Sequence, residues 1–160
     1  MSTVAGAELE FQALGATWRM EGAYTAAAPA TTQDLRYITP SARDLVAGVE
    51  FYPGDKETRA TLQLVAHQLH TKELLVEWKN VYAVSGDIEH PFGQGRWKAN
   101  LRFVSSINHR DTYISPRIAY LGFDAHEIYL AAHFFSGESQ GISGFHREHD
   151  LVTLGWQVKY

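Results

Sequence analysis

Apolar side chains occupy every second position over most of this sequence, and this period of two restricts the fold more than any other feature. The segment WKANLRF (97–103), for example, has Trp, Ala, Leu and Phe at alternate positions, separated by Lys, Asn and Arg. Successive side chains of a β-strand point to opposite faces of a sheet, so the pattern predicts strands with one apolar and one polar face. The same alternation predicts strands at 5–12, 16–24, 44–52, 58–67, 83–92, 96–106, 112–122, 127–135 and 150–160.

Short and long connections alternate between these predicted strands. Tight connections with Gly, Pro or Asp turn residues are found at 52–57, 92–96 and 122–127. Mostly longer connections, rich in Ala, Thr, Ser, Gly and His, are found at 25–43, 68–82, 106–112 and 136–149. This layout predicts an antiparallel up-and-down meander with its tight turns at one end and its long loops at the other. Segment 73–82 fits either an extension of the next strand or a short helix, and residues 1–160 are predicted to form a single domain.

Composition excludes several classes of protein. The net charge of −4 leaves no basic field for nucleic acid, and the lack of cysteine removes disulfides and thiolate metal sites. No apolar run of about 18 residues predicts a transmembrane helix. The N-terminal MSTVAGAELEF also lacks the basic and apolar regions of a signal peptide.

No motif points to enzyme or metal chemistry. The histidine pairs of HQLH (67–70) and HREH (146–149) are three residues apart, a spacing that does not preorganise a metal site on strands or loops. His133 has Ser136 and Ser139 nearby in the sequence, but no G-x-S-x-G motif accompanies them. We therefore predict no enzyme activity, no metal site and no cofactor.

The alternation fits two opposite placements of the apolar face. In a soluble antiparallel sheet the apolar side chains face a core, whereas in a transmembrane β-barrel they face lipid and the polar side chains face a wet lumen. Three features favour the barrel: the polar face mixes charges of both signs with small residues, aromatic residues gather near strand ends, and strands of about 9–11 residues suit a tilted crossing of the bilayer. The predicted lipid-facing and aromatic-girdle residues are Trp18, Phe51, Trp97, Phe103, Tyr120, Phe134, Trp156 and Tyr160.

The polar face supplies the candidate pore-lining residues. They are Arg19, Glu21, Glu50, Gln63, Asp87, Glu89, Lys98, Arg102, Arg117, His133 and Gln157. Rings of charged residues set the ion selectivity of pores. An eight-stranded barrel, however, has an interior just wide enough for side chains to fill, and there the same charges would form a paired polar core without conduction.

Three segments carry a resemblance to known proteins. The tail DLVTLGWQVKY (150–160) resembles the final strand of outer-membrane β-barrels, which typically ends on an aromatic residue, here Tyr160. Segment 6–25 resembles a strand–turn–strand of a family of large bacterial outer-membrane porins. Segments 85–103 and 115–138 resemble the last strands of the same porins, with a Pro-initiated strand, an Asp-containing tight turn and a Phe-x-Gly exit.

The resemblance implies a barrel of the bacterial outer membrane through which small polar solutes or ions diffuse passively. It also implies that the barrel assembly machinery reads the C-terminal strand and that a leader was removed or replaced. These porins have roughly twice as many strands, so the chain resembles their C-terminal portion, as a fragment, a split chain or an engineered small barrel. Counting strands back from a periplasmic C-terminus predicts a closed transmembrane barrel of about eight strands beginning at 16–24. Segment 5–12 is then a ninth strand, a lumen plug or a periplasmic arm.

Two other functions are compatible with the sequence. The first is a soluble lipocalin-like β-barrel that binds a hydrophobic ligand, which agrees with the missing signal peptide. The second is a non-conducting structural barrel whose loops 25–43 and 136–149 bind partners.

Overall fold

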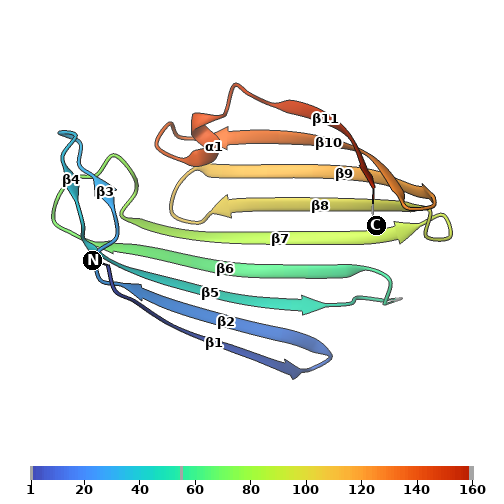
Figure 1. Ribbon diagram of the computed structural model, residues 1–160, viewed down its shortest axis with the longest axis horizontal. Coiled ribbons are helices and arrows are strands. Elements are labelled where there is room, and N and C mark those ends of the chain that lie inside the picture. The colour runs from blue at the N-terminus through green and yellow to red at the C-terminus, as the bar shows by residue number, and fades with distance from the viewer. Residues whose placement is uncertain (1, 55, 159–160) are drawn as a thin grey trace.

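Nine antiparallel strands form one curved sheet (Figure 1) in the computed structural model, which describes residues 2–54 and 56–158. The strands of this sheet are β1 (Val4–Ala13), β2 (Ala16–Thr25), β5 (Ser41–Phe51), β6 (Arg59–His70), β7 (Asn80–Phe92), β8 (Trp97–Ser106), β9 (Asp111–Phe123), β10 (His126–Gly137) and β11 (Leu151–Val158). They lie side by side in sequence order. The predicted all-β, antiparallel fold is confirmed.

Tight turns lie at one end of the sheet and long loops at the other (Figure 1). The β1–β2 turn is the shortest kind, with Leu14 at φ 56° and Gly15 at φ 75°. Two consecutive residues with positive φ are typical of the type I′ hairpin, in which glycine is favoured at the second position. We call these two ends of the sheet the turn end and the loop end.

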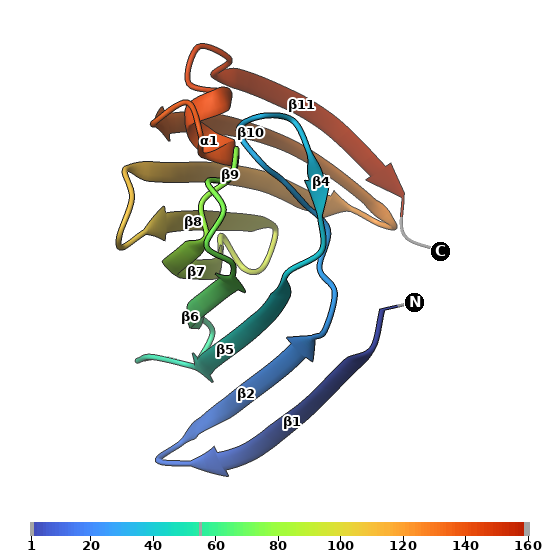
Figure 2. The same ribbon diagram turned by 90° about the vertical axis from the view of Figure 1, so that its left-hand side faces the viewer.

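The sheet is open, so the prediction of a closed barrel of about eight strands is wrong for this chain. Strand β1 pairs with β2 along its whole length, from Val4 opposite Thr25 to Ala13 opposite Ala16. This pairing occupies the edge of β2 that an eight-stranded barrel needs for β11. Segment 5–12 is therefore part of a sheet strand rather than a plug or an arm, and β1 and β11 form the two edges of the described sheet (Figure 2).

The sheet is curved, and its polar face is the concave one. Figure 2 shows the strands arranged as an open arc with the small hairpin of β3 (Ala30–Thr31) and β4 (Tyr37–Ile38) on its inner side. From β5 and β6, Ala42 and Leu69 pack against Ala30 of that hairpin. Both belong to the set of alternate positions that carries the polar residues. We call this the concave face and the opposite, apolar side the convex face.

The loop end contains small elements that the alternation did not predict. Hairpin β3–β4 lies within predicted loop 25–43, and the four-residue helix α1 (Ile142–Phe145) lies within predicted loop 136–149. Segment 73–82 contains no helix: β7 starts at Asn80, and the residues before it form a loop. Within residues 2–54 and 56–158, no helix has the length and apolar character needed to cross a membrane.

Candidate functional site

The convex face exposes large apolar side chains over its whole width. Leu64 in the middle of the sheet is 55% exposed, and Leu154 and Trp156 on β11 are 76% and 69% exposed. Exposed apolar area costs roughly 25 cal/mol per Å² in water, and soluble monomers rarely carry contiguous apolar patches larger than a few hundred Å². The convex face is therefore complementary to an apolar environment.

Aromatic rings gather along the turn end of this face. The ring centroids of Phe92 and Trp97 are 6.2 Å apart, and those of Trp97 and Tyr120 are 4.7 Å apart. Phe11 and Trp18 form a further stacked pair on β1 and β2 with centroids 6.5 Å apart. The row of rings resembles the interfacial girdle of membrane barrels.

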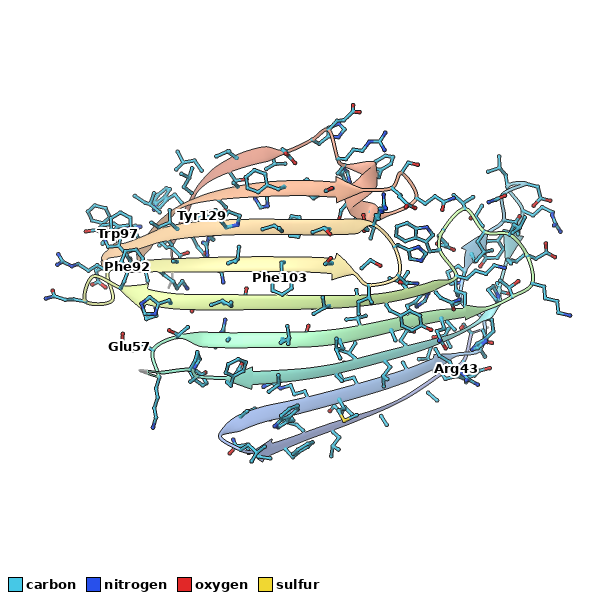
Figure 3. All side chains as sticks on the ribbon, turned by 180° about the vertical axis from the view of Figure 1, so that it is seen from behind. Arg43, Glu57, Phe92, Trp97, Phe103 and Tyr129 are labelled. Carbon is cyan, nitrogen blue, oxygen red and sulfur yellow. The ribbon has the colours of Figure 1, made fainter. Side chains whose placement is uncertain are left out.

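The predicted lipid-facing residues that the structure describes share the convex face, where they lie at two depths, with Phe103 and Phe134 farther from the turn end than the others. Figure 3 shows Trp97 at the turn end and Phe103 farther along β8, near the middle of the sheet. The strand register places on the convex face Trp18, Phe51, Trp97, Phe103, Tyr120, Phe134 and Trp156. Tyr160, the remaining predicted member, lies outside the described residues.

The predicted pore-lining residues share the concave face. The register places on it Arg19, Glu21, Glu50, Gln63, Asp87, Glu89, Lys98, Arg102, Arg117, His133 and Gln157. Their role in lining a pore stays a prediction. Most of them fall into three groups.

The first group is an ion-pair network across β6, β7 and β8. Arg102 Nε lies 3.4 Å from Asp87 Oδ2, and Lys98 Nζ lies 3.3 Å from Glu89 Oε2. Arg59 bridges the two carboxylates, with Nη2 3.6 Å from Asp87 and 3.9 Å from Glu89. The sequence interpretation missed Arg59, although Arg59 has the same alternation phase as Gln63. The network holds charges of both signs in fixed positions on the concave surface.

The second group lies on β9, β10 and β11. The Arg117 guanidinium donates to the carboxylate of Glu127, whose side chain is 4% exposed against 27% for that of Arg117. Arg117 also lies over the ring of Tyr129, 4.0 Å from its centroid. The Tyr129 ring in turn covers Gly155 across the strand pair, and a β-carbon at that glycine would overlap the ring. A cation, a carboxylate and an aromatic ring are thus packed together.

His133 is the centre of a hydroxyl cluster beside this group. Its Nδ1 lies 2.8 Å from Tyr113 Oη and 3.3 Å from Ser115 Oγ, and its Nε2 lies 3.3 Å from Thr153 Oγ1. Ser136 is on the other face of the sheet, so it does not pair with His133. The hydroxyl partners come from two other strands, β9 and β11, and sequence spacing alone gave no signal for them.

An open polar pocket of about 420 Å³ joins the second group to the histidine cluster. Its lining includes Arg102, Arg117, Tyr129, His133, Thr153 and Gln157. Hydrogen-bond donors, acceptors and an aromatic ring therefore converge on one part of the concave face, a composition suited to polar solutes. In the described part of the chain, no group of three or more His, Asp or Glu side chains is placed to hold a metal ion.

The third group is acidic and lies on β1, β2 and β5. Glu21 stands directly opposite Glu8, and Glu50 stands opposite Thr17. Arg19 donates to Glu10 at 2.6 Å, which leaves this edge of the concave face with an excess of carboxylates. Glu8 and Glu10 were missing from the predicted set because segment 5–12 had no assigned place in the sheet.

At the loop end, a polar cluster ties hairpin β3–β4 to the loop at 71–79. Thr32 Oγ1 donates to Asp34 Oδ1 at 2.5 Å, and Arg36 Nε donates to Asp34 Oδ2 at 2.5 Å. These bonds, that from Thr32 first, hold the pKa of the Asp34 carboxyl below its ordinary value. Arg36 also reaches Glu73 at 3.4 Å, and its own pKa is raised chiefly by the bond to Asp34.

Comparison with known proteins gives no family for this chain. No protein-family model, curated protein or solved structure matches the sequence or the fold.

Proposed function

We propose that this chain forms part of the wall of a bacterial outer-membrane β-barrel, with its convex face in lipid and its concave face lining a wet passage for small polar solutes or ions. The observation that carries the proposal is the opposition of the two faces. The convex face exposes large apolar side chains, whereas the concave face carries all but one of the Arg, Lys, Asp and Glu residues of the described strands. In this orientation, water solvates the charged side chains of the concave face and hydrocarbon surrounds the apolar side chains of the convex face.

Strand length and aromatic placement agree with this orientation. The nine strands of the sheet have between 8 and 13 residues, and about 9–11 tilted residues cross a bilayer. The ring pairs at the turn end match the position of an interfacial girdle. The porin resemblance implies that the same end, with its tight turns, faces the periplasm.

The strand directions restrict how such a barrel closes. Strands β1 and β11 both run from the loop end to the turn end (Figure 1). Direct pairing of β1 with β11 would therefore be parallel, whereas closure by antiparallel pairs alone needs an odd number of further strands, from this chain or another. The total is then even, as in bacterial single-chain barrels, and a large total gives a lumen that side chains do not fill.

The lipocalin-like alternative requires the reverse arrangement of the faces. A soluble barrel that binds a hydrophobic ligand needs its apolar side chains inside, where they bind the ligand and avoid water. Here Leu64 and Leu154 lie on the convex, exposed face. Curvature toward the polar face thus favours the membrane barrel over the soluble one.

In this proposal, the ion-pair network gives the passage its selectivity. Arg102 lies next to Asp87, yet its side chain is 65% exposed, so its charge faces the passage. Fixed charges act on passing ions within a Debye length, which is about 10 Å at 0.1 M salt. Reversing one such charge changes the local preference between cations and anions.

Planar-bilayer recording tests the proposal. The closed barrel, reconstituted with the strands that complete its wall, is expected to conduct. Arg102→Glu is expected to shift its reversal potential toward cation selectivity in a gradient around 0.1 M KCl. Arg102→Lys, which keeps the charge, is the matched control and should leave the reversal potential near that of the wild type. Absence of conductance, or equal reversal potentials for wild type and Arg102→Glu, would contradict the proposed function.

A further inference from the structure

Arg43 is the single Arg, Lys, Asp or Glu that the described strands place on the convex face. It stands opposite Tyr24 on β2 and opposite Gln68 on β6, near the loop end. Its neighbour Asp44 points to the concave face, where it contacts His67 Nδ1 at 2.6 Å. The carboxylate nearest in sequence is thus engaged on the other side of the sheet, and Arg43 is exposed.

An open groove of about 730 Å³ lies beside Arg43. Tyr24 and Tyr82 border it, and Leu45 lies one step from Arg43 toward the turn end. Its remaining lining on the convex face consists of small side chains, from Ala5, Ala7, Gly22 and Ala66. Small side chains between larger ones leave a depression in the apolar face. The polar residues that line this depression lie on its loop-end side.

The polar rim of the groove carries hydrogen-bond donors. Gln68 Nε2 donates to Tyr82 Oη at 2.5 Å, which leaves the Tyr82 hydroxyl proton to point elsewhere. The Arg43 guanidinium adds five N–H donors in a planar fork, the geometry that matches phosphate oxygens. Figure 3 shows Arg43 close to the loop end of the sheet, beyond the middle of the apolar face. A cation at the rim and an apolar floor are complementary to a molecule with an anionic head and a hydrocarbon tail.

We propose that this groove binds an anionic phospholipid, with its phosphate on Arg43 and one acyl chain lying over the small residues toward the turn end. The proposal rests on the proposed function, because it requires the convex face to lie in lipid. Charge complementarity selects the occupant: an uncharged apolar partner leaves Arg43 without an anion, and free phosphate leaves the groove unfilled. Arg43, the single Arg, Lys, Asp or Glu of the described strands on this face, thereby gains an anionic partner at the depth of the lipid headgroups.

Native mass spectrometry of the full chain in detergent tests the site, with phosphatidylglycerol and phosphatidylcholine as probes. The wild type is expected to retain phosphatidylglycerol more tightly than phosphatidylcholine. Arg43→Gln should weaken retention of phosphatidylglycerol by about fivefold, the effect of one basic residue at a membrane surface. Ala66→Phe, which fills the groove and keeps the cation, should also weaken it. Arg96→Gln, a charge removal at the turn end, is the matched control and should change nothing.

Three results would overturn the lipid site. They are equal retention of the two lipids by the wild type, unchanged retention by both Arg43→Gln and Ala66→Phe, and displacement of the lipid by millimolar inorganic phosphate alone. Heat-modifiable gel mobility of the same samples reports membrane folding separately. Folding in lipid with unchanged lipid retention would overturn the lipid site alone, whereas failure to fold in lipid would overturn the proposed function as well.

Discussion

The two faces of the sheet share one backbone but differ in the number and the pairing of their charged side chains. On the convex face Arg43 is the single Arg, Lys, Asp or Glu of the described strands, whereas the concave face pairs Arg102 with Asp87, Lys98 with Glu89 and Arg117 with Glu127. Alternation alone does not distinguish a water-soluble sheet from a membrane sheet, because both have one apolar and one polar face. Under the proposed function, the curvature of the sheet separates the two cases, because it determines which face can be enclosed.

The largest expected effect comes from placing a charge on the apolar face. Leu64→Arg puts a guanidinium in the middle of the convex face and should destabilise the protein in lipid vesicles by about 2–4 kcal/mol, the cost of Arg near the bilayer midplane. Gln63→Arg, one residue away on the concave face, should cost much less. Urea unfolding in vesicles measures both. If Gln63→Arg destabilised the protein as much as Leu64→Arg, the two faces would not differ in their environment.

The second expected effect tests the pairing of charges on the concave face. Glu127→Gln removes the buried partner of Arg117. Breaking a fully buried pair costs about 3–5 kcal/mol, and because Arg117 is partly exposed we expect about 2 kcal/mol in the same unfolding assay. Glu10→Gln, in the exposed pair with Arg19, is the control and should have a much smaller effect. Equal losses for the two variants would show that burial does not distinguish these ion pairs.

The smallest expected effect concerns the hairpin at the loop end, which lies against the concave face. The folded-state pKa of Asp34 is lowered, chiefly by the bond from Thr32. The stabilisation from the Asp34 carboxylate is therefore present above its unfolded-state pKa and is lost as the pH falls through the lower folded-state value. Carbon-13 NMR of the Asp34 carboxyl should show the lowered pKa, and Thr32→Val should raise it. Titration at or above the ordinary value for aspartate in the wild type would contradict this account.

Much of the sheet could be predicted from alternation, because alternation reports which side chains share a face. The positions of Trp97 and Lys98 on opposite faces follow directly from their places in the pattern. The tight turns could be predicted from residues such as Gly54 and Gly95, both of which have positive φ. These features depend only on neighbours in the sequence.

The rest depended on pairing between distant segments, which a single sequence does not report. The hydroxyl partners of His133 come from β9 and β11 and meet it only through the strand register. The sequence did not determine the place of segment 5–12, because alternation does not report which strand edge the segment pairs with. Hairpin β3–β4 has only two residue pairs, too few to show an alternating pattern, and it is held by contacts with the loop at 71–79.

Folding with and without detergent tests the central claim that lipid covers the convex face. Circular dichroism and heat-modifiable gel mobility are recorded for the same protein in plain buffer and in detergent or lipid. We predict a β-sheet spectrum and a heat-dependent mobility shift only when detergent or lipid is present. A folded, monodisperse protein in plain buffer would contradict it, because the exposed leucine and tryptophan side chains of the convex face would then have to be buried in a core.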